Sequence, residues 1–245
     1  RPPYTAPGAP HMKVIITMAG RGERFRRAGY DLPKYKIMAH DKSLLEWSLS
    51  SLQNFRHLEH IFLTLAEDPN TDFVYSVCQT LDIQRYQIHP LDQPTSGQAE
   101  TALAAKEYFT DPSEAILIYN IDTYVEPQAL TPNMIQGAAW LPAFEADGDQ
   151  WSFVNFDEDM IVNAVTEKRR ISKYGTIGLY YFESFELFQH CYKVCNFDTY
   201  SERYIAPMYQ VLIDDSSCEV HTSILPQDLI HVLGTPEDLA AFRVN

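Results

Sequence analysis

One stretch near the start of the chain decides the fold, Lys13-Val-Ile-Ile-Thr-Met-Ala-Gly-Arg-Gly-Glu-Arg-Phe25. Its first half is a continuous apolar run rich in β-branched residues, which is typical of a central strand buried on both faces. Its second half is a glycine turn that carries arginines, and Pro33-Lys34 follows shortly afterwards. A buried strand that runs directly into such a turn predicts an α/β sheet whose first loop lies beside a ligand.

The segments that follow continue this alternation, and Ser43 is placed to cap the first long helix. We predict helices at 43–52, 71–81, 98–108, 184–193 and 202–213, with a last helix from Pro236. We predict strands at 60–65, 86–89, 115–119, 138–141, 151–155, 161–165, 175–182 and 229–233. The pattern therefore indicates an α/β fold with a single Rossmann-like, doubly wound mixed sheet flanked by helices.

The first eleven of the 245 residues contain four prolines and show no apolar periodicity. We interpret residues 1–11 as an expression remnant and residues 12–245 as one domain. Single domains of this class commonly reach roughly 200–250 residues.

The composition excludes several classes of function. Hydrophobic residues make up 45% of the chain, and no apolar run approaches the ~20 residues that span a membrane, so no membrane partner is expected. The four cysteines lack the paired spacing of a metal site, and a cytoplasmic location fits best. The net charge of −14 argues against a nucleic-acid partner. Six of the nineteen Lys and Arg residues fall between Arg21 and Lys36, which favours a small anionic ligand.

The glycine turn and its cations indicate phosphate binding. Glycines let the backbone approach phosphate oxygens closely, Arg24 can hold oxygens in a fork, and Lys34 can neutralise charge that develops during transfer. A dinucleotide fingerprint would place a third glycine at Phe25, and a P-loop would end in Gly-Lys-Ser or Gly-Lys-Thr. Neither pattern is present, so Gly20-x-Gly22 alone identifies no known motif.

Several short motifs occur in the order found in a known family. Met18-Ala-Gly-Arg-Gly-Glu-Arg-Phe25 with Pro33-Lys34 resembles the signature of the sugar-1-phosphate nucleotidyltransferases, also called nucleoside-diphosphate-sugar pyrophosphorylases, in a short form. The further matches are Gln93-Pro94 with Gly97, Ala99 and Thr101, then Asn120-Ile-Asp122, Glu167-Lys168, Gly178-Leu-Tyr-Tyr-Phe182 and Gly234-Thr-Pro-Glu-Asp-Leu239. They span nearly the whole of residues 12–245, and their order is more specific than any one of them.

The resemblance implies a nucleotidyltransferase (GT-A-like) architecture, an NTP and a phosphorylated small molecule as partners, and Mg²⁺ as cofactor. The implied roles are as follows: Ala19, Gly20 and Gly22 line the nucleotide, Gln93 and Gly97 read the base, Arg24 and Lys34 grip the phosphates, Asp122 binds Mg²⁺, Glu167 and Gly178 bind the acceptor, and Lys168 holds the acceptor phosphate. Without the resemblance, an Asp after a strand is often a turn or cap residue, and a Glu-Lys pair is often solvated.

The sequence departs from the family at one position. Many members carry a second metal-binding Asp two residues before the Gly-Thr of the late motif, where this chain has Val232. His231 and Asp228 are the nearest candidate replacements. A single protein carboxylate, completed by nucleotide oxygens and water, would also suit Mg²⁺.

The predicted function is transfer of NMP from an NTP to a phosphorylated acceptor, with a sugar 1-phosphate as the first choice of acceptor. By resemblance, the product would supply the synthesis of a capsule or surface polysaccharide. The alternatives are a cytidylyltransferase that acts on a non-sugar phosphate such as phosphocholine, a glycosyltransferase that uses an NDP-sugar, and a non-catalytic sensor of nucleotide sugars. The sequence leaves open which NTP and which acceptor are used, and whether the protein forms a homo-oligomer.

Overall fold

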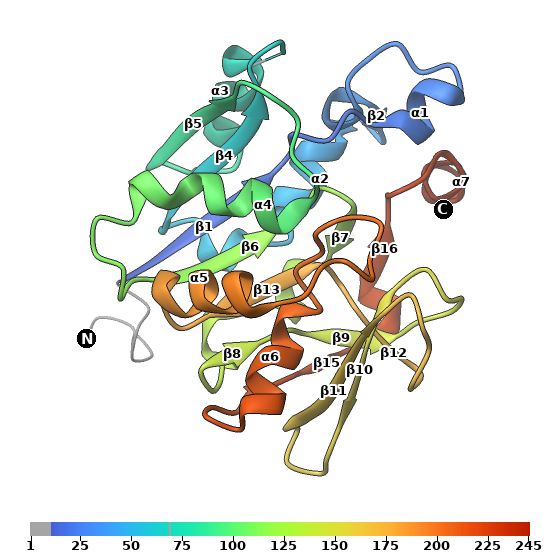
Figure 1. Ribbon diagram of the computed structural model, residues 1–245. Coiled ribbons are helices and arrows are strands. Elements are labelled where there is room, and N and C mark those ends of the chain that lie inside the picture. Colours follow the sequence, from blue (N-terminus) through green and yellow to red (C-terminus); the bar gives the residue numbers. More distant parts are fainter. Residues whose placement is uncertain (1–10, 69) are drawn as a thin grey trace, which may run out of the picture.

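A seven-stranded mixed sheet forms the centre of the molecule, with strands in the order β14-β8-β13-β6-β1-β4-β5 (Figure 1). The computed structural model describes residues 11–68 and 70–245, so nearly all of the predicted remnant at residues 1–11 lies outside it. The strands of this sheet are β1 (Met12–Thr17), β4 (Glu59–Leu65), β5 (Tyr86–Leu91), β6 (Ala115–Tyr119), β8 (Ala139–Trp140), β13 (Leu179–Phe182) and β14 (Val220–His221). Strands β6, β1, β4 and β5 are parallel to one another, whereas β13 is antiparallel to β6 and to β8.

Alternate residues of the parallel strands face opposite layers, because successive side chains of a strand point to opposite faces. Val14 and Ile16 pack into the layer that contains α2 (Leu44–Ser50) and α3 (Thr71–Thr80). Ile15 packs into the other layer, with residues of α4 (Gln98–Leu103), α5 (Phe185–Val194) and α6 (Met208–Asp215). This two-sided burial explains the unbroken apolar run of β1, and the predicted fold class is confirmed.

A second sheet lies beside the first, at the lower right of Figure 1. It contains, in spatial order, β11 (Val162–Glu167), β10 (Ser152–Phe156), β12 (Tyr174–Thr176), β9 (Ala143–Glu145) and β15 (Ile224–Leu225). The late strands, predicted within one mixed sheet, are thus divided between two sheets. The predicted strand 175–182 is divided as well, because the chain leaves the second sheet after Thr176 and turns at Gly178, with φ +84°, into β13 of the first.

Short elements complete the fold. They are α1 (Glu23–Arg27), α7 (Pro236–Val244), the hairpin of β2 (Met38–Ala39) and β3 (Lys42–Ser43), the antiparallel pair of β7 (Thr123–Val125) and β16 (Ile230–Val232), and 3₁₀ turns at Lys34–Lys36, Gln53–Phe55, Ala104–Tyr108, Pro127–Ala129, Pro132–Met134 and Gln227–Leu229. The predicted cap of α2 is confirmed, because the Ser43 side chain accepts a hydrogen bond from the Glu46 amide at 3.1 Å.

The helix predicted at 202–213 is wrong for its first six residues, because α6 begins only at Met208. Pro207 disfavours a helical conformation for the residue before it. The backbone of Arg203 is also engaged elsewhere, through hydrogen bonds with Ser96 and Ala99. Among the described helices, none has the combination of length and apolar character that crossing a membrane requires.

Candidate active site

A cleft of about 1180 Å³ opens at the carboxyl ends of β1 and β6. From β1 the parallel strands continue to β4 on one side and to β6 on the other, and ligands of doubly wound sheets bind at such a switch point. Ten of the eleven predicted site residues line this cleft: Ala19, Gly20, Gly22, Arg24, Lys34, Gly97, Asp122, Glu167, Lys168 and Gly178. Gln93 is exposed and lies outside the lining.

The glycine turn after β1 owes its shape to Gly22, which caps α1 with φ +63°. A Cβ at this position would also come within 3.4 Å of the Lys34 Cβ, so the turn lies directly against the second basic segment. Phe25 is buried and anchors α1. A Cβ at Gly20 would meet nothing within 4 Å, so the backbone of the turn is open toward the cleft.

Lys34 forms an ion pair with Asp122, which lies 88 residues away in the sequence. The ammonium lies 5.6 Å from the centroid of the Phe25 ring, and the side chain is only 15% exposed. The pKa of Lys34 is lowered to about 8, mainly by burial and also by the charge of Arg24, while the carboxylate of Asp238 opposes both effects. At neutral pH the protein therefore holds a largely desolvated cation directly against Asp122.

Asp122 follows β6 in a loop held from two sides. Its amide donates to the Asn120 side chain at 3.1 Å, and its carbonyl accepts from the Leu233 amide at 2.7 Å. Its side chain is 45% exposed and lines the cleft. The loop therefore fixes the backbone of Asp122 while its carboxylate oxygens stay accessible.

The pairing of β7 with β16 brings the late motif to this loop. Val232 pairs with Thr123, next to Asp122, and lines the cleft, so the position of the family's second carboxylate is apolar here. His231 lies outside the cleft, with its Nε2 atom 3.0 Å from Glu126. Asp228 is exposed and also lies outside the lining. Neither candidate replacement is therefore positioned beside Asp122.

Besides Glu202, one further carboxylate of the cleft has no role predicted from the sequence, that of Asp238. It caps α7 by accepting a hydrogen bond from the Thr235 amide at 3.1 Å, while the Asp238 amide donates to the Thr235 hydroxyl. It also lines the cleft close enough to Lys34 to raise the pKa of that lysine. The pattern Thr235-x-x-Asp238 indicates a capping box, and nothing in the sequence marks it as a neighbour of Lys34.

The loop before α4 forms another wall of the cleft. Gly97 has φ +149° and ψ 177°, a conformation essentially restricted to glycine. A Cβ there would lie 2.6 Å from the backbone N and O atoms of Arg203. Gln98, which the sequence analysis did not select, lines the cleft and donates a hydrogen bond to the Thr17 hydroxyl at 3.1 Å. Of Gln93 and Gln98, only Gln98, the first residue of α4, lines the cleft.

Glu167 ends β11 on the opposite wall of the cleft, and Lys168 directly follows it. Burial raises the pKa of Glu167, although the hydrogen bond that its carboxylate accepts from Ser152 opposes the shift. Lys168 has φ +56°, which is uncommon for a residue with a side chain, and its amide donates to the Trp151 carbonyl at 2.9 Å. Its Nζ atom donates to the Tyr204 hydroxyl at 2.9 Å, and this bond raises the pKa of Lys168.

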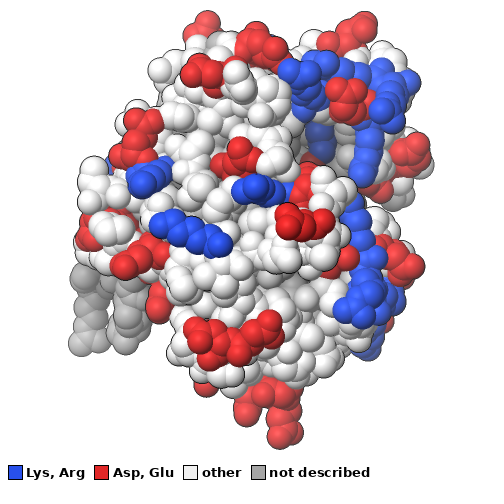
Figure 2. Space-filling model, viewed as in Figure 1, with Lys and Arg blue, Asp and Glu red and all other residues white. Residues whose placement is uncertain are grey.

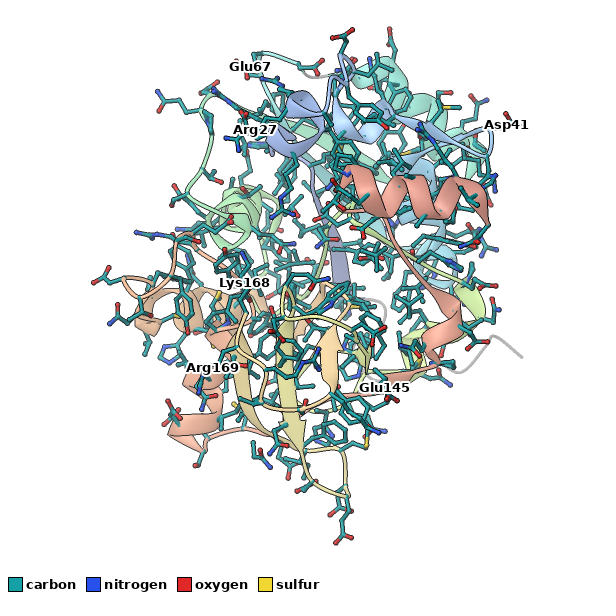
Figure 3. All side chains as sticks on the ribbon, turned by 90° about the vertical axis from the view of Figure 1, so that its right-hand side faces the viewer. Arg27, Asp41, Glu67, Glu145, Lys168 and Arg169 are labelled. Carbon is teal, nitrogen blue, oxygen red and sulfur yellow. The ribbon has the colours of Figure 1, made fainter. Side chains whose placement is uncertain are left out.

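The charges are unevenly distributed over the surface. Figure 2 shows basic side chains gathered over α1 and its neighbouring loop, at the upper right, and further basic side chains down the right-hand edge and near the middle of this face, among acidic and neutral ones. In Figure 3, Lys168 lies at mid-height, below Arg27 and above Arg169 and Glu145. The basic residues of the glycine turn and Lys168 thus lie on two sides of one cleft.

Comparison with solved structures gives likenesses along 95% of the chain. The structure of the nucleoside-diphosphate-sugar pyrophosphorylase from Vibrio cholerae RC9 matches with a TM-score of 0.85 and 27% identity, over 100% of that chain. The inositol-1-phosphate CTP transferase from T. maritima matches with a TM-score of 0.74 and 17% identity, over 94% of that chain. A protein assigned as a glucose-1-phosphate thymidylyltransferase from Bacillus anthracis, in complex with a sucrose, matches with a TM-score of 0.75 and 14% identity, also over 94%.

No protein-family model matches the chain, and no curated protein sequence matches it. The two likenesses below 25% identity establish the fold alone. The likeness to the Vibrio cholerae protein covers the whole of that protein and, within this chain, agrees with the ordered motifs. The resemblance seen in the sequence is thus confirmed: the chain is similar, over 95% of its length, to a nucleoside-diphosphate-sugar pyrophosphorylase, and it shares its fold with two further nucleotidyltransferases.

Proposed function

We propose that the chain transfers NMP from an NTP to a phosphorylated acceptor, a sugar 1-phosphate, and releases pyrophosphate. The observation that carries this proposal is the meeting of the glycine turn, Lys34 and Asp122 at one end of a cleft whose other wall carries Lys168. Support comes from the fold shared with the Vibrio cholerae pyrophosphorylase at 27% identity.

The residues of the cleft suit a displacement that needs no general base. An oxygen of the acceptor phosphate, already anionic near neutral pH, attacks the α-phosphorus, and the bond from that phosphorus to the bridging oxygen of the β-phosphate breaks. Lys168 orients the attacking phosphate. Arg24 and Lys34 stabilise the negative charge on the departing pyrophosphate. Catalysis then rests on positioning and on charge neutralisation.

The proposed cofactor is Mg²⁺, held by Asp122. The carboxylate fits this role because it is accessible from the cleft and because Mg²⁺ is usually bound by one or two carboxylates together with substrate phosphates and water. Val232 leaves the neighbouring position without an oxygen ligand. When bound there, the ion would supply positive charge to the phosphate oxygens.

The acceptor side of the cleft combines polar and aromatic side chains. It is lined by Gln150, Trp151, Ser152, Glu167, Thr176, Tyr180, Ser201, Glu202 and Tyr204. The hydrogen-bonding side chains among them suit the several hydroxyl groups of a sugar, which choline lacks, whereas the aromatic rings would suit either ligand. We therefore place the sugar 1-phosphate first, ahead of a non-sugar phosphate such as phosphocholine.

A matrix of four NTPs against phosphorylated acceptors tests the function. Pyrophosphate release is measured with glucose 1-phosphate, other sugar 1-phosphates, inositol 1-phosphate and phosphocholine, with Mg²⁺ present. We expect release only in the presence of an acceptor, with a sugar 1-phosphate as the best substrate. Pyrophosphate release with phosphocholine and with none of the other acceptors would show that the acceptor is a non-sugar phosphate. Turnover of an NDP-sugar without any NTP would indicate a glycosyltransferase, and tight binding without turnover in any combination would indicate a sensor.

Lys34→Ala tests the role of the basic turn. We expect turnover to fall by a factor of about 10² to 10³, the usual effect of removing one group that stabilises developing charge. Lys36→Ala is a matched control, because Lys36 belongs to the same 3₁₀ turn but lies outside the cleft, 5.5 Å from the centroid of the Phe73 ring. Near-normal pyrophosphate release by Lys34→Ala, or an equal loss in Lys36→Ala, would refute the assigned role.

A further inference from the structure

The segment Ser201–Ile205 connects the two walls of the cleft, although it carries no recognised motif. On one side, the Arg203 amide donates to the Ser96 carbonyl at 2.8 Å, and the Arg203 carbonyl accepts from the Ala99 amide at 3.0 Å. These bonds join the segment to the loop that contains Gly97. Ile205 is only 1% exposed and anchors the segment in the core. The segment is therefore fixed to the nucleotide side of the cleft.

On the other side, Tyr204 of the same segment holds the side chain of Lys168. The Lys168 Nζ atom donates to the Tyr204 hydroxyl at 2.9 Å and lies 5.0 Å from the centroid of the Tyr204 ring. The Tyr204 hydroxyl is itself 3.0 Å from the hydroxyl of Ser201. Tyr204 thus contacts the lysine through both its ring and its hydroxyl group, and the hydroxyl group has a second partner.

This contact restricts a side chain that is otherwise flexible. A lysine has four rotatable carbon bonds, and its ammonium group is a strongly hydrated point charge. One of its three donors is used by Tyr204, which leaves two for a phosphate. The left-handed backbone of Lys168, with its amide bonded to Trp151, fixes the base of the same side chain. Both ends of Lys168 are therefore held before any ligand arrives.

We propose that Tyr204 is a positioning residue that holds Lys168 for the acceptor phosphate, and that it is itself held from the nucleotide side through the segment Ser201–Ile205. This inference rests on the proposed function. A residue that acts only through Lys168 affects the use of the acceptor and not the binding of the NTP. Loss of its hydroxyl group therefore raises the KM for the acceptor and leaves the KM for the NTP unchanged.

The test is Tyr204→Phe, which keeps the ring and removes the hydroxyl group. With the best acceptor of the matrix, starting from glucose 1-phosphate, we expect the acceptor KM to rise about tenfold, the size of effect expected for one hydrogen bond to a charged group. The KM for the NTP and the melting temperature should stay near those of the wild type. An unchanged acceptor KM, or an equal rise in both KM values, would overturn the inference.

Tyr192→Phe is the matched control. Tyr192 also accepts a hydrogen bond from a cation, at 2.5 Å from Arg203 Nη1, and the centre of that guanidinium lies 5.6 Å from its ring, but Tyr192 lies outside the cleft. We expect wild-type kinetics from it. The same rise in acceptor KM would show that any loosening of this region has this effect, and would contradict a specific role for Tyr204.

A double-mutant cycle with Lys168→Ala separates positioning from general packing. If Tyr204 acts through Lys168, then Tyr204→Phe changes nothing further in the Lys168→Ala background. Independent, additive losses would contradict the inference. If the wild type releases no pyrophosphate, the proposed function is refuted and the inference with it. If the wild type releases pyrophosphate and Tyr204→Phe has the same acceptor KM, only the inference is refuted.

Discussion

Gly97→Ala should separate the two walls of the cleft. Gly97 has φ +149° and ψ 177°, and a Cβ at this position would lie 2.6 Å from both the N and the O atoms of Arg203. These are backbone atoms, so neither can move aside as the end of a flexible side chain could. The segment Ser201–Ile205 must therefore move away from the loop.

The cost of this change can be worked out from the contacts. A side chain in this region of φ and ψ costs about 1–3 kcal/mol. The displacement also breaks the hydrogen bonds from Arg203 to Ser96 and from Ala99 to Arg203, each worth about 1 kcal/mol. We expect the free energy of unfolding to fall by about 3–5 kcal/mol, which lowers Tm by about 10 °C in a chain of this size. In the folded fraction, the KM values for both substrates should rise.

The assay combines thermal melting with initial-rate kinetics at a temperature where the variant is folded. Gly29→Ala is the control, because Gly29 also has a positive φ of +92° but a Cβ there would meet nothing within 4 Å, and Gly29 lies outside the cleft. Gly29→Ala should lower the free energy of unfolding by less than Gly97→Ala does, and it should leave the KM values for both substrates unchanged. In a chain of this size, a loss of about 1 kcal/mol in the free energy of unfolding lowers Tm by about 2–4 °C. A Gly97→Ala variant with unchanged kinetics and a Tm within about 2 °C of the wild type would therefore refute this reasoning.

Two further predictions concern pH and metal. Burial lowers the pKa of His60 to about 4, so its neutral form stabilises the fold above the ordinary pKa of 6.5, and this contribution is lost as the pH falls toward 4. By linkage this contribution to the free energy of unfolding amounts to about 3 kcal/mol. Urea unfolding should therefore show that the stability of the wild type falls more steeply than that of His60→Leu between pH 6.5 and 4. Parallel plots of stability against pH would contradict this prediction. Chelation of the metal by EDTA should abolish pyrophosphate release, and addition of Mg²⁺ should restore it. Chelation should not lower Tm, because Asp122 is paired with Lys34 without the metal and the described residues hold no cluster of three His, Cys, Asp or Glu side chains. Activity that survives chelation would exclude the proposed metal.

The sequence was most informative where local pattern and burial agree. The apolar run of β1 predicted a strand buried on both faces, and Val14, Ile15 and Ile16 are all fully buried. Ser43 predicted the start of α2 because a cap is a local interaction. Gly22 and Asp122 were predicted at strand ends, and the parallel pairing of β1 with β6 brings those ends together.

The sequence was least informative about contacts between distant segments. Asp238 and Val232 reach the cleft only because β16 pairs with β7, and neither position predicts that pairing. The apolar spacing of 202–213 favoured a helix, but the backbone of Arg203 bonds to Ser96 instead. For the same reason Tyr204 was overlooked. Gln93 lies in the loop before α4 and Gln98 is the first residue of that helix, and only the fold shows that Gln98 lines the cleft.

The central claim is that the glycine turn and Asp122 form one site for a triphosphate. A crystal structure of the chain with Mg²⁺ and a non-hydrolysable NTP tests it most directly. The account predicts phosphate oxygens against the backbone of Gly22 and the ammonium of Lys34, with the metal bound by Asp122. A triphosphate bound elsewhere, with Lys34 still paired to Asp122, would contradict it.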